Sequence, residues 1–259
     1  MELRNVIFER APIAIVTINR PAAMNALNRA VIEELSWTVG AVAGDASIRV
    51  LIITGAGDRA FVAGADIETL STMSPVEGRE FMRLGHGLMR ALEELAQPVI
   101  AAVDGYALGG GLELALACDL AVASERARFG LPETGLGIIP GFGGTQRLAH
   151  RIGHARAREA ILTGEMFDAA KALEWGLVNR VVPAGEALAA ARALADKLAT
   201  RPAVALAEAK AALHAAATME EDAGLSFERR AFAVAFASED RTEGTRAFIE
   251  KRKPAWRHR

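Results

Sequence analysis

Two glutamates in glycine-rich surroundings are the residues of this sequence best suited to acid–base chemistry. Glu113 follows three glycines, Gly109–Gly111, at the start of a helical pattern, and Glu133 lies in the segment Phe129-Gly-Leu-Pro-Glu133. Burial disfavours the charged form of a carboxyl group and raises its pKa. Two carboxyl groups that face one site can share the acid and base roles. Because one glutamate comes from a helix start and the other from a loop, both can face one pocket.

The glycines before Glu113 also predict a place for an anionic oxygen. The first N–H groups of a helix have no partner within it, and the helix dipole is positive there. A second N–H donor from the small-residue loop Phe61-Val-Ala-Gly-Ala-Asp-Ile67 would complete an oxyanion hole, which stabilises a developing enolate by several kcal/mol. Structural alternatives stay open: the glycines permit close packing, Glu113 complements the dipole, and Asp66 caps the next helix.

Alternating strands and helices must position these residues. Asn28 is the expected N-cap of a helix with Val31, Ile32, Leu35, Val39 and Val42 at helical spacing, and a second helix contains the residues from Phe81 to Leu95. Apolar, β-branched segments predict strands at 6–8, 13–18, 50–54, 98–103, 120–123 and 127–129. This alternation favours an α/β domain with a largely parallel sheet.

The composition and the secondary-structure pattern of the sequence change near residue 184. Beyond it the chain is rich in alanine, lacks strand patterns and predicts four helices, at about 185–199, 202–216, 219–237 and 241–251. We therefore expect an α/β core domain at 1–184 and a helical C-terminal region at 185–259.

Composition excludes several classes of function. The formal net charge of −2 over 259 residues favours neither nucleic acid nor an anionic membrane. The single cysteine, Cys118, excludes an internal disulfide framework, and the histidines have no zinc-site spacing, so no metal site is expected. The charged N-terminus does not resemble a signal peptide, and no apolar run is long enough to span a membrane. These features predict a soluble, cytoplasmic protein.

Three other motifs are weaker. Gly55-Ala-Gly-Asp-Arg-Ala60 matches a dinucleotide fingerprint, but no helix pattern begins there. Neither a G-x-S-x-G elbow nor a P-loop is present. The basic residues between Arg147 and Arg158 could contact RNA or a phosphorylated ligand, but a solvated or subunit-contacting helix face is favoured, since no aromatic residues are interleaved for base stacking.

Five ordered motifs resemble the crotonase superfamily, and within it the enoyl-CoA hydratases. They are Asn25-Ala-Leu27, Phe61-Val-Ala-Gly-Ala-Asp-Ile67, Asp104-Gly-Tyr-Ala-Leu-Gly-Gly-Gly-Leu-Glu113, Phe129-Gly-Leu-Pro-Glu133 and Ile139-Pro-Gly-Phe-Gly-Gly-Thr-Gln-Arg147. The resemblance extends over nearly the whole chain. It implies the crotonase fold of repeated ββα units, with a helical C-terminal region used for trimerisation. Trimers of this family commonly pair into hexamers.

The resemblance also implies a reaction and its residues. The N–H groups of Ala65 and Gly110 would bind the thioester oxygen of a 2-enoyl-CoA. Glu113 would act as base on the attacking water, and Glu133 would protonate the α-carbon, giving 3-hydroxyacyl-CoA. This is the chemistry of a hydro-lyase, and no metal or cofactor is expected beyond the coenzyme A of the substrate. Alternatives are a 3-enoyl-CoA isomerase, another acyl-CoA lyase of the superfamily, or a non-catalytic RNA-binding relative.

The resemblance further implies contacts to the rest of the substrate. The expected residues are Ala22, Ala26, Leu27, Ala63, Gly64, Asp66, Ile67, Tyr106, Gly109, Pro132 and Gly141, with Phe248 and Lys251 supplied by a neighbouring subunit. Ala22 stands where the family often has a lysine, so a phosphate contact is in doubt. Met73, Met82, Leu84 and Met89 are candidates for the acyl pocket, although a place in the helix core is favoured for them.

Overall fold

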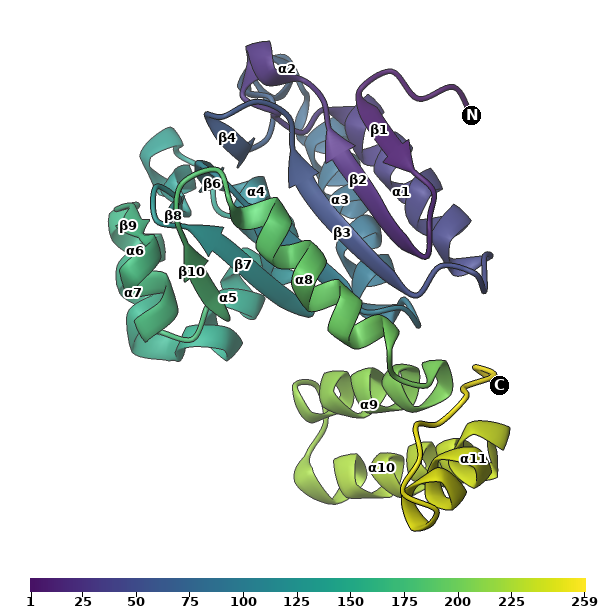
Figure 1. The fold of residues 1–259 in the computed structure, drawn as a ribbon. Coiled ribbons are helices and arrows are strands. Elements are labelled where there is room, and N and C mark those ends of the chain that lie inside the picture. The colour runs from purple at the N-terminus through teal and green to yellow at the C-terminus, as the bar shows by residue number, and fades with distance from the viewer.

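The computed structural model describes residues 1–259 and shows an α/β fold built on two sheets (Figure 1). The larger sheet has the strand order β1-β2-β3-β5-β7-β10. Its strands are β1 (Val6–Glu9), β2 (Ile13–Ile18), β3 (Val50–Gly55), β5 (Val99–Val103), β7 (Leu120–Ser124) and β10 (Arg180–Val182). Every neighbouring pair is parallel except β1 and β2. The predicted α/β class with a largely parallel sheet is confirmed.

Helices cover both faces of this sheet. Leu51 and Ile53 of β3 belong to the main core, which α1 (Arg29–Ala43) and α3 (Pro75–Glu94) close from one side. Val50 and Ile52 face the opposite way and pack with Ala191 of α8 (Ala187–Ala199), which crosses the other face (Figure 1). Successive side chains of a strand point to opposite faces, so a strand covered on both is apolar throughout.

Side-chain caps fix where the two covering helices begin. The Oδ1 atom of Asn28 accepts a hydrogen bond of 3.0 Å from the N–H of Val31, which confirms Asn28 as the N-cap of α1. Ser74 and Glu77 form a reciprocal capping box at the start of α3. Such caps satisfy backbone donors that have no partner inside the helix.

A second, smaller sheet stands at the carboxyl ends of the main strands. Its strand order is β4-β6-β8-β9, and the strands are β4 (Ala60–Ala63), β6 (Tyr106–Leu108), β8 (Arg128–Gly130) and β9 (Phe167–Asp168). The first three pair in parallel. The sequence predicts β8, but it predicts a loop at 55–66 and a direct passage from a turn into the glycines, so β4 and β6 correct that expectation.

The remaining helices complete the layers around both sheets. In the core these are α2 (Ile67–Ser71), α4 (Gly110–Leu116), α5 (Gly144–Ile152), α6 (His154–Thr163) and α7 (Ala169–Glu174), with 3-10 turns at Pro21–Ala23 and Pro132–Leu136. The C-terminal helices are α9 (Ala203–Ala216), α10 (Glu221–Ala237) and α11 (Glu239–Ile249). No helix combines the length and the apolar character that a membrane span requires.

The C-terminal helices confirm the four predicted segments, with every boundary within two residues of the predicted one. Figure 1 shows α9–α11 as a group beside the core, whereas α8 lies on the main sheet. Lys210 of α9 joins this group to the core, because its Nζ lies 2.8 Å from Asp119 Oδ2 and donates to the carbonyls of Leu92 and Gln97. The domain division at residue 184 stays a prediction.

Candidate active site

Glu113 is a buried carboxylate held by backbone amides. It lies in α4 with 1% of its surface exposed, and its Oε1 accepts hydrogen bonds of 2.7 Å from the N–H groups of Phe142 and Gly144. A Cβ atom at Gly144 would lie 2.9 Å from that oxygen, so only glycine lets the backbone approach so closely. These two bonds fix the orientation of the carboxylate.

Glu133 reaches the same place from the 3-10 turn Pro132–Leu136. Its Oε2 is buried and has no hydrogen-bond partner. Its Oε1 lies 2.8 Å from the point that a Cβ of Gly109 would occupy, and Gly109 has φ +49° and ψ −125°. Gly109 therefore gives both the backbone conformation and the space that bring Glu133 against the start of α4.

Burial raises the pKa of both glutamates. It raises the pKa of Glu133 to about 7, with a further contribution from the charge of Glu113. Burial also raises the pKa of Glu113, while the N–H groups of Gly144 and Phe142 and the charge of Arg147 act in the opposite direction. One site thus holds two neighbouring carboxyl groups whose pKa values are both raised by burial.

Ala65 and Gly110 lie just beyond the end of one strand pair and line the same cavity. Ala63 of β4 pairs with Leu108 of β6 in parallel as the last pair of that ladder, and Ala65 and Gly110 each follow two residues later. The N–H of Leu27 donates to Gly64 and its carbonyl accepts from Asp66. In a parallel ladder the N–H of the intervening residue, Ala65, then points away from Leu27.

Gly110 supplies the second free donor at this point. It is the first residue of α4, and the first N–H groups of a helix have no acceptor within it. The next glycine serves packing instead, because a Cβ at Gly111 would overlap the carbonyl of Val62. The glycine run thus combines a free N–H donor at Gly110 with the packing role that the sequence left open, which Gly111 fills.

These groups line a cavity of about 160 Å³. Ten of the residues expected at the site line it: Ala63, Gly64, Ala65, Ile67, Gly109, Gly110, Glu113, Pro132, Glu133 and Gly141. Its other lining residues are Leu70, Met82, Leu108, Leu136, Ile138, Ile139 and Phe142. The cavity is apolar apart from the carboxyl groups and the backbone donors, which suits a ligand with a polar reactive end and a hydrocarbon chain.

Seven expected residues lie outside this cavity. Leu27 is fully buried beside Gly110, and Asp66 caps α2 and pairs with Arg20 at 3.1 Å, the structural role that the sequence left open for it. Tyr106 lies on β6 and is 37% exposed. The others, Ala22, Ala26, Phe248 and Lys251, lie on the surface loop before α1 or at the end of α11.

The lining residues that sequence reasoning missed follow Glu133 in the chain, apart from Leu70 on α2 and Leu108 on β6. Leu136, Ile138 and Ile139 come shortly after Glu133, and their apolar residue types so close to a candidate glutamate were the signal available in the sequence. Met82 packs against the main core and also lines the cavity, so it fills both of the roles considered for it, whereas Met89 is a core residue as expected.

Arg147 supports the turn that holds Glu113. Its guanidinium forms two bonds of 2.6 Å with Glu93 and donates to the carbonyl of Phe142 at 2.9 Å. Phe142 in turn donates its N–H to Glu113. This member of the basic cluster is therefore an internal residue, about one fifth exposed, with a positioning role.

Comparisons with known proteins agree on the family that this chain resembles. Residues 9–259 match the family model described as enoyl-CoA hydratase/isomerase. The chain is 47% identical to the short-chain-enoyl-CoA hydratase of Clostridium acetobutylicum, over 98% of this chain and 97% of that protein. It is 44% identical to the crotonyl-CoA hydratase of Syntrophomonas wolfei, over 98% of each.

A solved structure gives the same result for the fold. The enoyl-CoA hydratase from Bacillus anthracis superimposes with a TM-score of 0.95 at 40% identity, covering 99% of this chain and 100% of that one. The expected crotonase fold is thereby confirmed.

Proposed function

The chain belongs to the enoyl-CoA hydratase/isomerase family, and from that premise we propose that it hydrates 2-enoyl-CoA thioesters to 3-hydroxyacyl-CoA. One observation carries the proposal. Buried Glu113 and half-buried Glu133, both with raised pKa values, line one apolar cavity together with Ala65 and Gly110, whose N–H groups have no hydrogen-bond partner in the protein. Relatives over the full chain are named as hydratases, which supports a hydro-lyase.

In the proposed first step the N–H groups of Ala65 and Gly110 bind the thioester oxygen. Polarising that carbonyl draws electrons from the double bond and makes the β-carbon electrophilic. Ionised Glu113 removes a proton from water as the water oxygen bonds to the β-carbon, and the electron pair of the double bond moves to the thioester oxygen as an enolate. The Oε1 atom of Glu113 is held by the N–H groups of Phe142 and Gly144, so its Oε2 atom is left to accept the proton of the water.

In the second step protonated Glu133 delivers its proton to the α-carbon as the enolate collapses. A pKa of about 7 keeps a substantial fraction of Glu133 protonated at neutral pH, and its Oε2 makes no hydrogen bond within the protein that proton transfer would have to break. The cycle ends with Glu113 protonated and Glu133 ionised, and one proton passed between them through water restores the starting state. The two groups titrate together, so this division of roles describes the pair.

A short acyl chain fits the cavity best. Its volume of about 160 Å³ is close to that of cavities that hold a molecule the size of benzene, and Met82 and Phe142 are among the side chains that line it. Relatives named for short-chain and crotonyl substrates support the same class. We include crotonyl-CoA as the proposed test substrate for this reason.

Contacts between subunits are also part of the proposal. Large apolar side chains of the C-terminal helices are exposed, among them Phe232, Phe236, Phe248 and Ile249. Monomeric proteins rarely expose such groups together. We propose that α9–α11 form the contacts of a homotrimer, and that Phe248 and Lys251 reach a neighbouring subunit's coenzyme A there.

The alternative reactions of the family need fewer groups. A 3-enoyl-CoA isomerase needs one carboxyl group to move a proton between carbons, so the presence of a second carboxyl group in the cavity favours hydration.

An RNA-binding role would need a free basic face, but Arg147 is engaged by Glu93 and Arg156 lies over the Trp175 ring.

The test measures the decrease in absorbance of the enoyl thioester after purified protein is mixed with crotonyl-CoA. We expect rapid loss with the wild type, and rates lower by several orders of magnitude with Glu113→Gln and Glu133→Gln. Glu174→Gln, an exposed change with no polar contact, is the matched control and should keep full activity. If the wild type leaves crotonyl-CoA and longer 2-enoyl thioesters intact, the hydratase proposal fails.

A further inference from the structure

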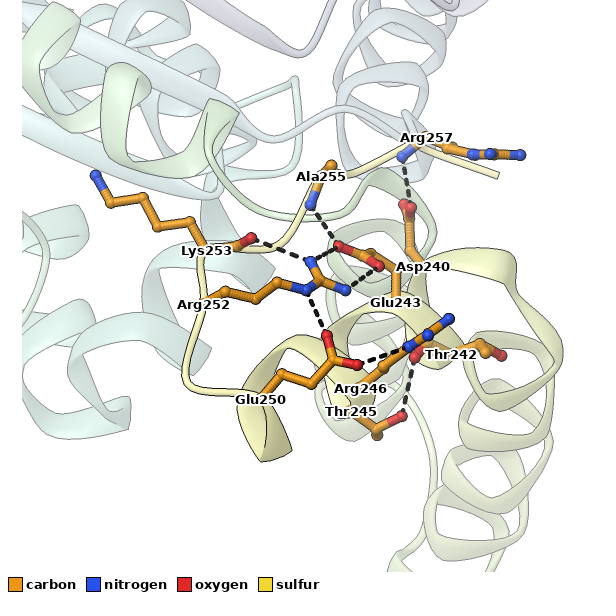
Figure 2. Close-up of polar contacts among 10 residues, drawn as sticks. All are labelled: Asp240, Thr242, Glu243, Thr245, Arg246, Glu250, Arg252, Lys253, Ala255 and Arg257. Atoms are coloured by element: carbon orange, nitrogen blue, oxygen red, sulfur yellow. Dashed lines mark hydrogen bonds and ion pairs between the residues drawn. The ribbon is translucent and has the colours of Figure 1, made fainter.

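The arginine networks of this structure differ in what they hold in place. At the C-terminal tail, Arg252 donates to Glu243 at 2.6 and 2.9 Å and to Glu250 at 2.7 Å (Figure 2). The N–H of Ala255 also donates to Glu243, at 2.7 Å, so the residues after α11 are tied back onto that helix. None of these residues lines the active-site cavity. This network therefore fixes the course of the tail and has no direct link to the cavity.

Arg20, in contrast, cross-links the loop before α1 to the segment that carries Ala65. Its Nη1 donates to the carbonyl of Ala26 at 2.7 Å, and its Nη2 donates to Asp66 Oδ2 at 3.1 Å. The side chains of Arg20 and Asp66 are each about one fifth exposed, so water screens the pair only in part. Ala26 directly precedes Leu27, and Asp66 directly follows Ala65. The guanidinium thus joins the two backbone segments that meet beside the proposed oxyanion hole.

Backbone hydrogen bonds between the same two segments lie on either side of Ala65. The N–H of Leu27 donates to the carbonyl of Gly64 at 2.8 Å, and the carbonyl of Leu27 accepts from the N–H of Asp66 at 2.9 Å. One residue of the loop therefore contacts both neighbours of Ala65, and its position sets the direction of the Ala65 N–H. An oxyanion hole is effective because its donors already point at the oxygen, about 3 Å away, before the reaction begins. A shift of the loop would turn this donor away.

The loop that carries Leu27 has a strained backbone. Met24 and Asn25 have φ values of +53° and +58°, in the left-handed region that residues other than glycine seldom adopt. Such conformations cost on the order of 1–3 kcal/mol each and persist only where the surroundings hold them. Asn25 is 1% exposed, accepts from the N–H of Arg20 at 3.0 Å, and donates to two carbonyls of the segment 56–60 at 2.9 and 2.8 Å. Asn25 thus fixes the loop to the core, and Arg20 fixes it to the segment of Ala65.

We propose that Arg20 is a positioning residue for the oxyanion hole, because its guanidinium holds Ala26 and Asp66 at the same time. This role rests on the proposed function, in which the N–H of Ala65 binds the thioester oxygen. A guanidinium suits it, since its donors lie in one rigid plane and can reach two acceptors together. The alternative is that Arg20 binds a phosphate of coenzyme A directly. Against that alternative, Asp66 already neutralises the charge of Arg20.

Turnover of crotonyl-CoA gives the first test. Arg20→Met should lower kcat about 10- to 100-fold, the loss expected when a reacting geometry shifts by up to about 1 Å, with a much smaller change in KM. Arg20→Lys should recover part of the rate. Asp66→Asn should show an intermediate loss, because asparagine still caps α2 but gives up the bond to Arg20. Arg10→Met, which removes an exposed pair with Asp45, is the matched control and should keep the wild-type values.

The infrared band of an isotopically labelled carbonyl gives a readout that does not depend on turnover. The probe is butyryl-CoA labelled at its thioester carbonyl, which has the acyl length of crotonyl-CoA but no double bond to hydrate. Binding to the wild type and to Arg10→Met should lower the C=O stretching frequency, because N–H donors polarise the carbonyl. In Arg20→Met the band should return towards its position in free solution, and in Arg20→Lys it should lie between. A loss of stability alone leaves the band of the folded protein unchanged.

The two readouts separate this role from the hydratase proposal. A wild type that shifts the band without hydrating crotonyl-CoA, together with an Arg20→Met variant that does not shift it, would refute hydration and still support the positioning role. If Arg20→Met does not fold, Asp66→Asn decides through the same band. The positioning role is overturned if the wild type does not shift the band, if the folded variants shift it as the wild type does, or if they raise KM with kcat unchanged.

Discussion

The substitution Glu133→Gln should stabilise the folded protein, and increasingly so as the pH rises. Burial raises the pKa of Glu133 from its ordinary 4.5 to about 7 in the folded state. Below pH 4.5 the group is protonated in both states. Between pH 4.5 and about pH 7 the folded state keeps a proton that the unfolded state has lost, so the wild type loses stability as the pH rises through this range. Glutamine does not titrate and escapes this loss.

The size of the effect follows from the two pKa values. One pKa unit corresponds to about 1.4 kcal/mol, so the full difference between 4.5 and about 7 corresponds to about 3 kcal/mol. Because the carboxyl group borders a cavity that opens to water, screening reduces this to about 2 kcal/mol. The stability advantage of Glu133→Gln over the wild type should grow by that amount from mildly acidic to mildly alkaline pH.

Urea denaturation at a series of pH values, at one fixed protein concentration, measures this difference. Glu174→Gln, the exposed control, should follow the wild type at every pH. A constant difference between Glu133→Gln and the wild type across the whole range would show that Glu133 titrates normally. The acid role proposed for this residue would then lose its physical basis.

Three further changes test the geometry of the site. Met82→Ala should raise the rate with six- or eight-carbon 2-enoyl-CoA relative to crotonyl-CoA, because Met82 lines the acyl cavity; an unchanged ratio would place the chain elsewhere. Gly109→Ala should cost about 1–3 kcal/mol in urea denaturation and lower turnover more than about tenfold, because its φ of +49° disfavours a side chain and a Cβ would lie 2.8 Å from Glu133 Oε1. Arg147→Met should lower kcat roughly 10- to 100-fold with little change in KM, and Arg147→Lys should recover part of it, because the lost bond to Phe142 loosens the turn that holds Glu113. An equal loss in Arg147→Met and Arg147→Lys, with a raised KM, would indicate general disruption instead.

The main sheet and its helices are predictable because their signals are long and regular. β3 is a run of apolar, β-branched residues covered on both faces, and Asn28 stands directly before the apolar spacing of α1. The strands β4 and β6 are not predictable in the same way. They have four and three residues, and β6 is bounded by Gly105 and Gly109, so neither shows enough alternation to be distinguished from a loop.

The two glutamates can be found from the sequence because their residue type and glycine surroundings are unusual. The donors that hold Glu113 cannot be found in this way, since the N–H groups of Phe142 and Gly144 are backbone atoms that every residue type except proline carries.

The hydrogen bonds of Glu113 also bear on how such a site could change its chemistry over generations. The carboxylate that would act on water is at the same time the acceptor that ties the start of α5 to α4. A lineage that replaced it with an apolar residue would leave two amide groups without an acceptor in a dry interior, at a cost of about 1–3 kcal/mol each. New reactions on this scaffold are therefore easier to reach by altering Glu133, whose side chain fastens no other segment. Loss of Glu113 would have to arrive together with a substitute acceptor, such as an asparagine or a retained water molecule.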